Sequence, residues 1–181
     1  MIIENPNFSL KEIDKRKYIE SGVIIDSFVL IIYFLSMYVA DNKNKNYTLK
    51  CCNVNEHHIN CLNSILQGFR IKKLIITTNI LSEFLNKIRR DLKKDYKDIK
   101  SKFMSQLIEI DEIHIPKNIL LNHNDFIDFG NDISLLIASE ENIKNNKYST
   151  IISLDGRFIN KFFDKRDDIL AFNMNVLSCF F

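Results

Sequence analysis

Glycine and proline are scarce in this chain of 181 residues, which has only 4 Gly and 2 Pro. The glycines are far apart in the sequence, at Gly22, Gly68, Gly130 and Gly156. P-loops and dinucleotide-binding turns need several closely spaced glycines, so that the backbone can approach a phosphate. The sequence therefore excludes these two kinds of nucleotide-binding site.

Cysteine is also rare, with 4 residues in the whole chain. This number and spacing do not form a disulfide framework, and we expect a reduced, cytoplasmic protein. One compact group does combine sulfur and imidazole ligands, namely Cys51, Cys52, His57, His58 and Cys61. It lacks the CxxC pair of typical zinc sites, so a structural zinc is the less favoured interpretation of this group.

Charge of one sign is not in excess, because the net charge is only +2. Any nucleic-acid-binding surface must therefore be local. Residues 87–102 contain eight Lys or Arg and three Asp. Helical spacing places Lys87, Arg90 and Lys94 on one face, which could follow a phosphate backbone or could simply be solvated. Arg157 is a further candidate for phosphate contact, with an ion pair to an acid as the alternative.

The longest apolar stretch, at 22–40, contains a carboxylate near its start, Asp26. The basic residues at 15–17 precede it, as they would precede a membrane span. An acid at the centre of a span costs about 2.5–3.5 kcal/mol, and less near its end. A buried strand followed by a buried helix is the favoured interpretation, and a membrane anchor is the alternative.

Strand and helix patterns alternate along the rest of the chain. β-branched runs predict strands at 22–25, 73–78, 112–116, 149–154 and 169–174. Helical periodicity predicts helices at 27–40, 57–69 and 131–146, a short one from Gly156, and a long stripe from Leu81 to Leu107 that breaks between Lys94 and Lys100. This order indicates an open, mostly parallel sheet covered on both faces. We expect one domain at 21–181 with a polar insertion at about 41–56, preceded by an N-terminal extension at 1–20 that forms a helix after Ser9.

Three carboxylates lie at the ends of predicted strands or about one helical turn beyond, and a parallel sheet could bring a fourth to the same edge from the start of a helix. Asp26 follows the first strand and Asp155 the fourth, Glu83 lies in the helix after the second, and Asp132 begins a late helix. Taken singly, Asp155 fits a turn residue, Asp132 a helix cap and Glu83 an acid in a first helical turn. The carboxyl ends of parallel strands meet at one edge, where binding crevices form. Carboxylates gathered there repel one another unless a cation such as Mg²⁺ binds, and such a site suits phosphodiester hydrolysis.

Four short motifs carry a family resemblance: VIIDSF, LIITTNILSEF, GNDISLLIASEE and TIISLDGRF. With them, residues 22–175 resemble a PIN domain, the metal-dependent nuclease fold of toxin–antitoxin ribonucleases and RNA-processing enzymes. The resemblance implies a three-layer α/β/α sandwich that cleaves single-stranded RNA with Mg²⁺ or Mn²⁺ and leaves a 5′-phosphate. It also implies that Asp26, Glu83, Asp132 and Asp155 hold metal and water, and that Ser27 and Ser153 support them. Asp125 and Asp128 lie close to Asp132, which is preferred because it begins a helical run.

The favoured hypothesis is thus a divalent-metal-dependent endoribonuclease, in one version the toxin of a toxin–antitoxin pair. The implied partners are single-stranded or structured RNA, an antitoxin protein and a second copy in a homodimer, with no membrane. On this hypothesis Asp26→Asn abolishes metal-dependent cleavage and leaves the fold intact. The alternative is a catalytically silent PIN-like module that binds RNA or protein in a larger RNA-processing assembly.

Overall fold

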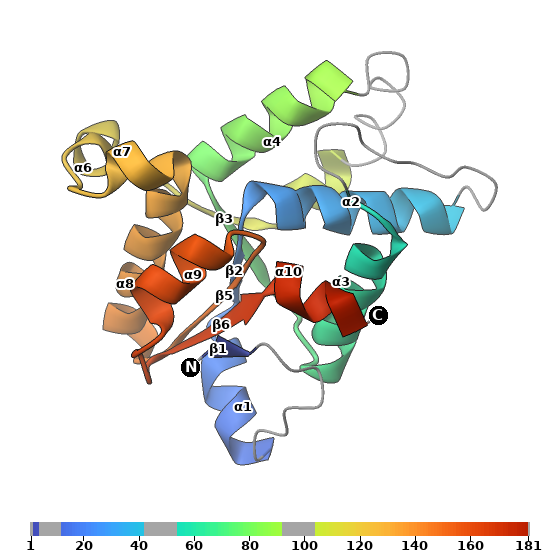
Figure 1. The fold of residues 1–181 in the computed structure, drawn as a ribbon, viewed down its shortest axis with the longest axis horizontal. Helices are drawn as coiled ribbons and strands as arrows, with labels where there is room; N and C mark the ends of the chain where they lie inside the picture. Colours follow the sequence, from blue (N-terminus) through green and yellow to red (C-terminus); the bar gives the residue numbers. More distant parts are fainter. Residues whose placement is uncertain (1, 4–11, 42–53, 92–103, 181) are drawn as a thin grey trace.

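A sheet of six parallel strands forms the centre of the computed structural model, which describes residues 2–3, 12–41, 54–91 and 104–180 (Figure 1). The strands are β1 (Ile2–Ile3), β2 (Val23–Ile25), β3 (Leu74–Thr77), β4 (Asp111–Ile113), β5 (Ser149–Ser153) and β6 (Ile169–Asn173). Their order across the sheet is β1-β6-β5-β2-β3-β4, and every neighbouring pair is parallel.

Helices cover both faces of this sheet, which makes the fold a three-layer α/β/α sandwich, as predicted. On one side α2 (Ser27–Asp41) packs against α3 (Glu56–Gly68) and α4 (Thr78–Asp91). On the other side α8 (Ile133–Asn146) packs on β2, β3 and β5, and α9 (Gly156–Phe163) packs on β6. The ribbon shows α8 and α9 on one side of the strands and α2, α3 and α10 (Met174–Leu177) on the other (Figure 1).

Burial on both faces explains the runs of apolar residues in the inner strands. All residues of β2, β5 and β6 are buried, and those of β2 are fully inaccessible. Strands covered on both faces need apolar side chains at successive positions rather than at alternate ones. The runs of Ile, Val and Leu therefore fix where the central strands lie.

The chain order changes direction at the centre of the sheet. From β2 the chain goes to β3 on one side, and it later returns to β5 on the other side of β2. At such a switch point the connections leave the carboxyl ends of the two strands in opposite directions and open a crevice between them. The fold therefore places a crevice beside the ends of β2 and β5, where Asp26 and Asp155 follow.

The 22–40 stretch does not form one continuous helix. It divides into β2 and α2, and Asp26 stands between them. None of the helices in the described ranges is both long and apolar enough to cross a membrane.

The predicted elements lie close to the observed ones, with a few differences. The predicted strand at 112–116 is shorter, because Pro116 is already the N-cap residue of α6 (Lys117–Leu121). Several elements were not predicted, namely β1, α6, α7 (Phe126–Phe129), the 3₁₀ turn η1 (Gly130–Asp132), α10 and a second 3₁₀ turn, η2 (Ser178–Phe180). In the N-terminal extension, α1 (Glu12–Ile19) forms the expected helix, while β1 joins the edge of the sheet beside β6. Ser9, most of the 41–56 insertion and the break expected between Lys94 and Lys100 lie outside the described residues.

Candidate functional site

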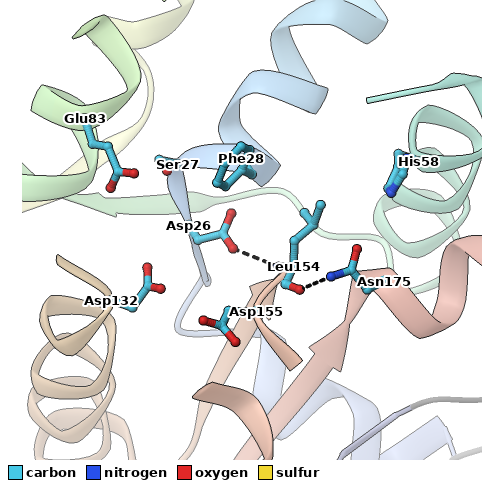
Figure 2. Close-up of a pocket in the computed structure, with 9 residues that line it drawn as sticks. All are labelled: Asp26, Ser27, Phe28, His58, Glu83, Asp132, Leu154, Asp155 and Asn175. Atoms are coloured by element: carbon cyan, nitrogen blue, oxygen red, sulfur yellow. Dashed lines mark hydrogen bonds between the residues drawn. The ribbon is translucent and has the colours of Figure 1, made fainter. Parts of the chain in front are cut away.

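A cavity of about 370 Å³ lies at the carboxyl edge of the sheet, beside the ends of β2 and β5. The four predicted acids all line it, although they come from four separate segments of the chain (Figure 2). Its lining consists of Asp26, Ser27, Phe28, His58, Glu83, Asp132, Leu154, Asp155 and Asn175. The carboxylates surround one end of this space, and His58 and Asn175 stand at the other end (Figure 2).

Asp26 is buried and accepts three hydrogen bonds. The N–H of Val29 donates to Oδ1 (2.6 Å), while the Ser153 hydroxyl (2.5 Å) and the Leu154 N–H (2.8 Å) donate to Oδ2. The bond to Val29 caps the first turn of α2. Burial raises the pKa of Asp26, and these three hydrogen bonds act in the opposite direction. Asp26 therefore joins the end of β2 to the end of β5 and is held in a fixed orientation.

Asp155 is the N-cap residue of α9. Its Oδ1 accepts hydrogen bonds from the N–H groups of Arg157 (2.8 Å) and Phe158 (3.0 Å). The Ser153 hydroxyl in turn accepts a bond from the Asp155 N–H (3.0 Å), so Ser153 touches both acids that follow the central strands. Ser153 therefore makes the supporting hydrogen bonds that the sequence predicts, and Asp155 also has the structural role of a helix cap.

Asp132 does not act as the helix cap that its sequence position suggested. It lies at the start of α8, but its carboxylate makes no capping hydrogen bond to the described backbone there. Its pKa is raised from 3.8 to about 7, chiefly by burial and then by the charges of Asp26, Glu83 and Asp155. The other three acids are thus close enough for their charges to act on Asp132.

Glu83 is paired with a cation from its own helix. Lys87 Nζ lies 2.5 Å from Glu83 Oε1 and donates a hydrogen bond to the Ser27 hydroxyl (3.0 Å). It also stands 3.4 Å from the centre of the Phe28 ring. Lys87 was predicted to lie on an RNA-binding helix face, but the structure directs its ammonium group toward the acids.

The other predicted phosphate-binding residues lie elsewhere. Arg90 is exposed on α4 and Arg157 is exposed at the start of α9, and neither is among the described residues that line the cavity. The Arg157 guanidinium stands over the Phe129 ring, 5.8 Å from its centre. Lys94 lies outside the described residues.

Four lining residues were not predicted as part of the site: Phe28, His58, Leu154 and Asn175. Phe28 and Leu154 stand next to predicted site residues. Asn175 follows the last strand, as Asp26 and Asp155 follow β2 and β5. Position after a strand could therefore have indicated all three. His58 comes from α3, where its Nδ1 and the Asn55 side chain form a capping box. No local pattern connects that helix to the acids.

The cysteine and histidine group provides no zinc site within the described residues. Cys51 and Cys52 lie outside them. Burial raises the pKa of the Cys61 thiol to about 12, and its sulfur lies 3.6 Å from that of Met174. Cys61 is therefore a core residue.

The acids fit a hard divalent cation by their chemistry, because carboxylate oxygens are the ligands that Mg²⁺ and Mn²⁺ prefer. Their present arrangement is not a coordination shell. In the described part of the chain, no group of three or more His, Cys, Asp or Glu side chains is placed so that it could hold a metal ion. Glu83 is held by Lys87, while Asp26 and Asp155 use oxygens to accept hydrogen bonds.

Comparisons with family models, with curated proteins and with solved structures found no match for this chain. The residues, their geometry and the resemblance of the four motifs therefore support the function proposed for this protein.

Proposed function

We propose that this protein is a divalent-metal-dependent nuclease that hydrolyses phosphodiester bonds in single-stranded RNA. The observation that carries the proposal is the meeting of Asp26, Glu83, Asp132 and Asp155 around one cavity at the switch point of a parallel sheet. Crevices at this place in such sheets are where ligands bind. The choice of RNA as substrate follows the resemblance of the motifs to PIN domains.

The acids would hold Mg²⁺ or Mn²⁺, with Ser153 keeping Asp26 in position. A divalent ion bound by carboxylates supplies an activated water and neutralises charge on a phosphate group. Asp26 is oriented by three hydrogen bonds and Asp155 by the start of α9, so these two carboxylates are pre-organised. The N-terminal ends of α2 and α9 direct backbone N–H groups toward them, which hold their oxygens in place.

The test is cleavage of end-labelled single-stranded RNA by the full chain, with Mn²⁺ and with EDTA. Wild type is expected to cleave only with metal, and Asp132→Asn to reduce the rate more than about 100-fold, because even residues that merely support a metal ligand contribute 10–100-fold. Asp132 is the preferred variant, since Asp26→Asn would also disturb three hydrogen bonds. The exposed Asp128→Asn is the matched control and keeps wild-type activity.

A catalytically silent binding module is the second candidate, and the Lys87–Glu83 ion pair favours it, since a lysine already neutralises part of the acid cluster. RNA binding without cleavage, at a level unaffected by Asp132→Asn and by EDTA, would establish this candidate in place of the nuclease. Cleavage of single-stranded DNA in preference to RNA would keep the metal chemistry and change the substrate.

A further inference from the structure

The Lys87 ammonium group contacts three residues that line the acid site, and it does not lie on an open helix face. Its side chain is 15% exposed and makes three contacts, to the Glu83 carboxylate, the Ser27 hydroxyl and the face of the Phe28 ring. An ammonium group is strongly hydrated, so its partial burial requires contacts that replace water. A carboxylate, a hydroxyl and an aromatic face supply them here, and they hold Lys87 in place.

The charge of Lys87 acts on more than Glu83. It opposes the effect of burial, which raises the pKa of both Asp26 and Asp132. A single lysine thus balances part of the negative charge of three acids. In this role it provides what a bound cation would provide, although it comes from the chain itself.

Glu83 and Lys87 are four residues apart on α4, so the pair closes within one helical turn. The Glu83 oxygen that lies 2.5 Å from the ammonium gives one lone pair and part of its negative charge to Lys87, so it is a weaker ligand for a divalent ion while that contact persists. A divalent ion among the acids would in addition be repelled by the neighbouring ammonium. Lys87 and a metal therefore compete for the same carboxylate.

We propose that Lys87 is a built-in counter-cation, which holds Glu83 in the metal-free protein and competes with a divalent metal for the acid site. The inference rests on the proposed function for the metal and adds a residue that sets the affinity for it. It also accounts for acids that line one cavity without forming a coordination shell within the described residues. Lys87 is a positioning residue in this account, since it acts through Glu83.

The experiment is calorimetric titration of Mn²⁺ into the full, metal-stripped chain, for wild type and for Lys87→Met. Methionine keeps a long apolar stem against Phe28 and removes the charge. The Mn²⁺ affinity of Lys87→Met is expected to rise on the order of tenfold, as for removal of one positive charge a few ångströms from a divalent ion in solvated surroundings. Lys87→Arg keeps the charge and is expected to stay near wild type.

Two comparisons separate this effect from general ones. Lys161 also pairs with an acid, Asp125, and stands over the Phe129 and Phe162 rings, but Asp125 is not among the described residues that line the cavity, whereas Glu83 is. Lys161→Met is therefore expected to leave Mn²⁺ affinity unchanged. In a Glu83→Gln background the gain from Lys87→Met is expected to shrink, because the two residues act as one unit.

Mn²⁺ affinity that stays equal or falls in Lys87→Met overturns the inference and leaves the metal-dependent function standing. Binding of Mn²⁺ to neither protein overturns both, and binding to Lys87→Met alone supports the inference strongly. Should Lys87→Met not fold, Lys87→Gln removes the charge and keeps a donor for Ser27 and Glu83. The rise of Tm with added Mn²⁺ provides a second readout that does not depend on activity.

Discussion

Asp132→Asn is expected to stabilise the metal-free protein, and more at pH 8 than at pH 5. The pKa of Asp132 is raised from 3.8 to about 7, chiefly by burial and then by the charges of Asp26, Glu83 and Asp155. Between these two values the unfolded chain is ionised at this position and the folded chain is protonated. The native state then binds more protons, so the stability of wild type falls as pH rises from about 4 to about 7.

The magnitude follows from the same two values. One pKa unit corresponds to about 1.36 kcal/mol. The stability of wild type is therefore expected to fall by about 2–3 kcal/mol between pH 5 and pH 8 through the titration of Asp132. Asp26, whose pKa burial also raises, adds to the loss in the same direction, and the Lys87 charge reduces it. Asparagine cannot ionise, so Asp132→Asn removes the contribution of Asp132. For a chain of this size the difference corresponds to roughly 4–12 °C in Tm.

The assay is urea unfolding in EDTA at pH 5 and pH 8 for wild type, Asp132→Asn and the exposed Asp128→Asn. The stability advantage of Asp132→Asn over wild type is expected to grow between the two pH values, whereas Asp128→Asn shows no such growth. An advantage of equal size at pH 5 and pH 8 would refute the argument that neighbouring carboxylates and burial act on Asp132. Added Mn²⁺ is expected to reverse the order at pH 8, since it stabilises wild type by binding.

Two further changes test how the site is supported. Ser153→Ala is expected to lower the free energy of unfolding by about 1–3 kcal/mol, because it removes the donor to Asp26 and the acceptor of the Asp155 N–H. Urea unfolding measures the loss, and Ser139→Ala, at a buried residue whose hydroxyl donates to the Leu136 carbonyl within α8, should lose clearly less. Gly22→Ala is expected to lower the free energy of unfolding by about 1–3 kcal/mol, because φ is +93° and a Cβ would lie 2.8 Å from Ile75 Cδ1. The fall in Tm measures this loss. Gly68→Ala, with no described atom within 4 Å of the added carbon, should not destabilise, and equal losses at the two glycines would contradict the steric argument.

Local patterns were sufficient for the main elements of the fold. The β-branched runs locate the four inner strands within one or two residues, and helical periodicity locates α2, α3, α8 and α9. Such patterns depend on burial at the spacing of each element, which the sequence carries directly. The edge strands were predicted less well, because β1 has two residues and β4 is largely exposed, so neither carries a strong apolar signal.

Position after a strand predicted three of the acids that share the cavity, Asp26, Glu83 and Asp155, whereas Asp132 was predicted as the start of a helix that the sheet could bring to the same edge. Parallel strands direct their carboxyl ends to one edge, so residues that follow them gather there whatever the length of chain between. Ser153, which hydrogen-bonds to Asp26, was expected from the resemblance of its motif. Individual roles were not predictable in this way: Asp155 caps a helix, whereas Asp132, which looked like a cap, does not.

By itself, the sequence determined the elements, the parallel sheet and the edge at which its acids gather, since each depends on burial and chain direction along a short segment. Only the tertiary structure decided that Lys87 faces the acids and that His58 closes the far end of the cavity. Helical periodicity gives the face on which a side chain lies, but not what the neighbouring helix places opposite to it. That depends on the packing of α2, α3 and α4 over the strands, which is set by contacts between residues far apart in the chain.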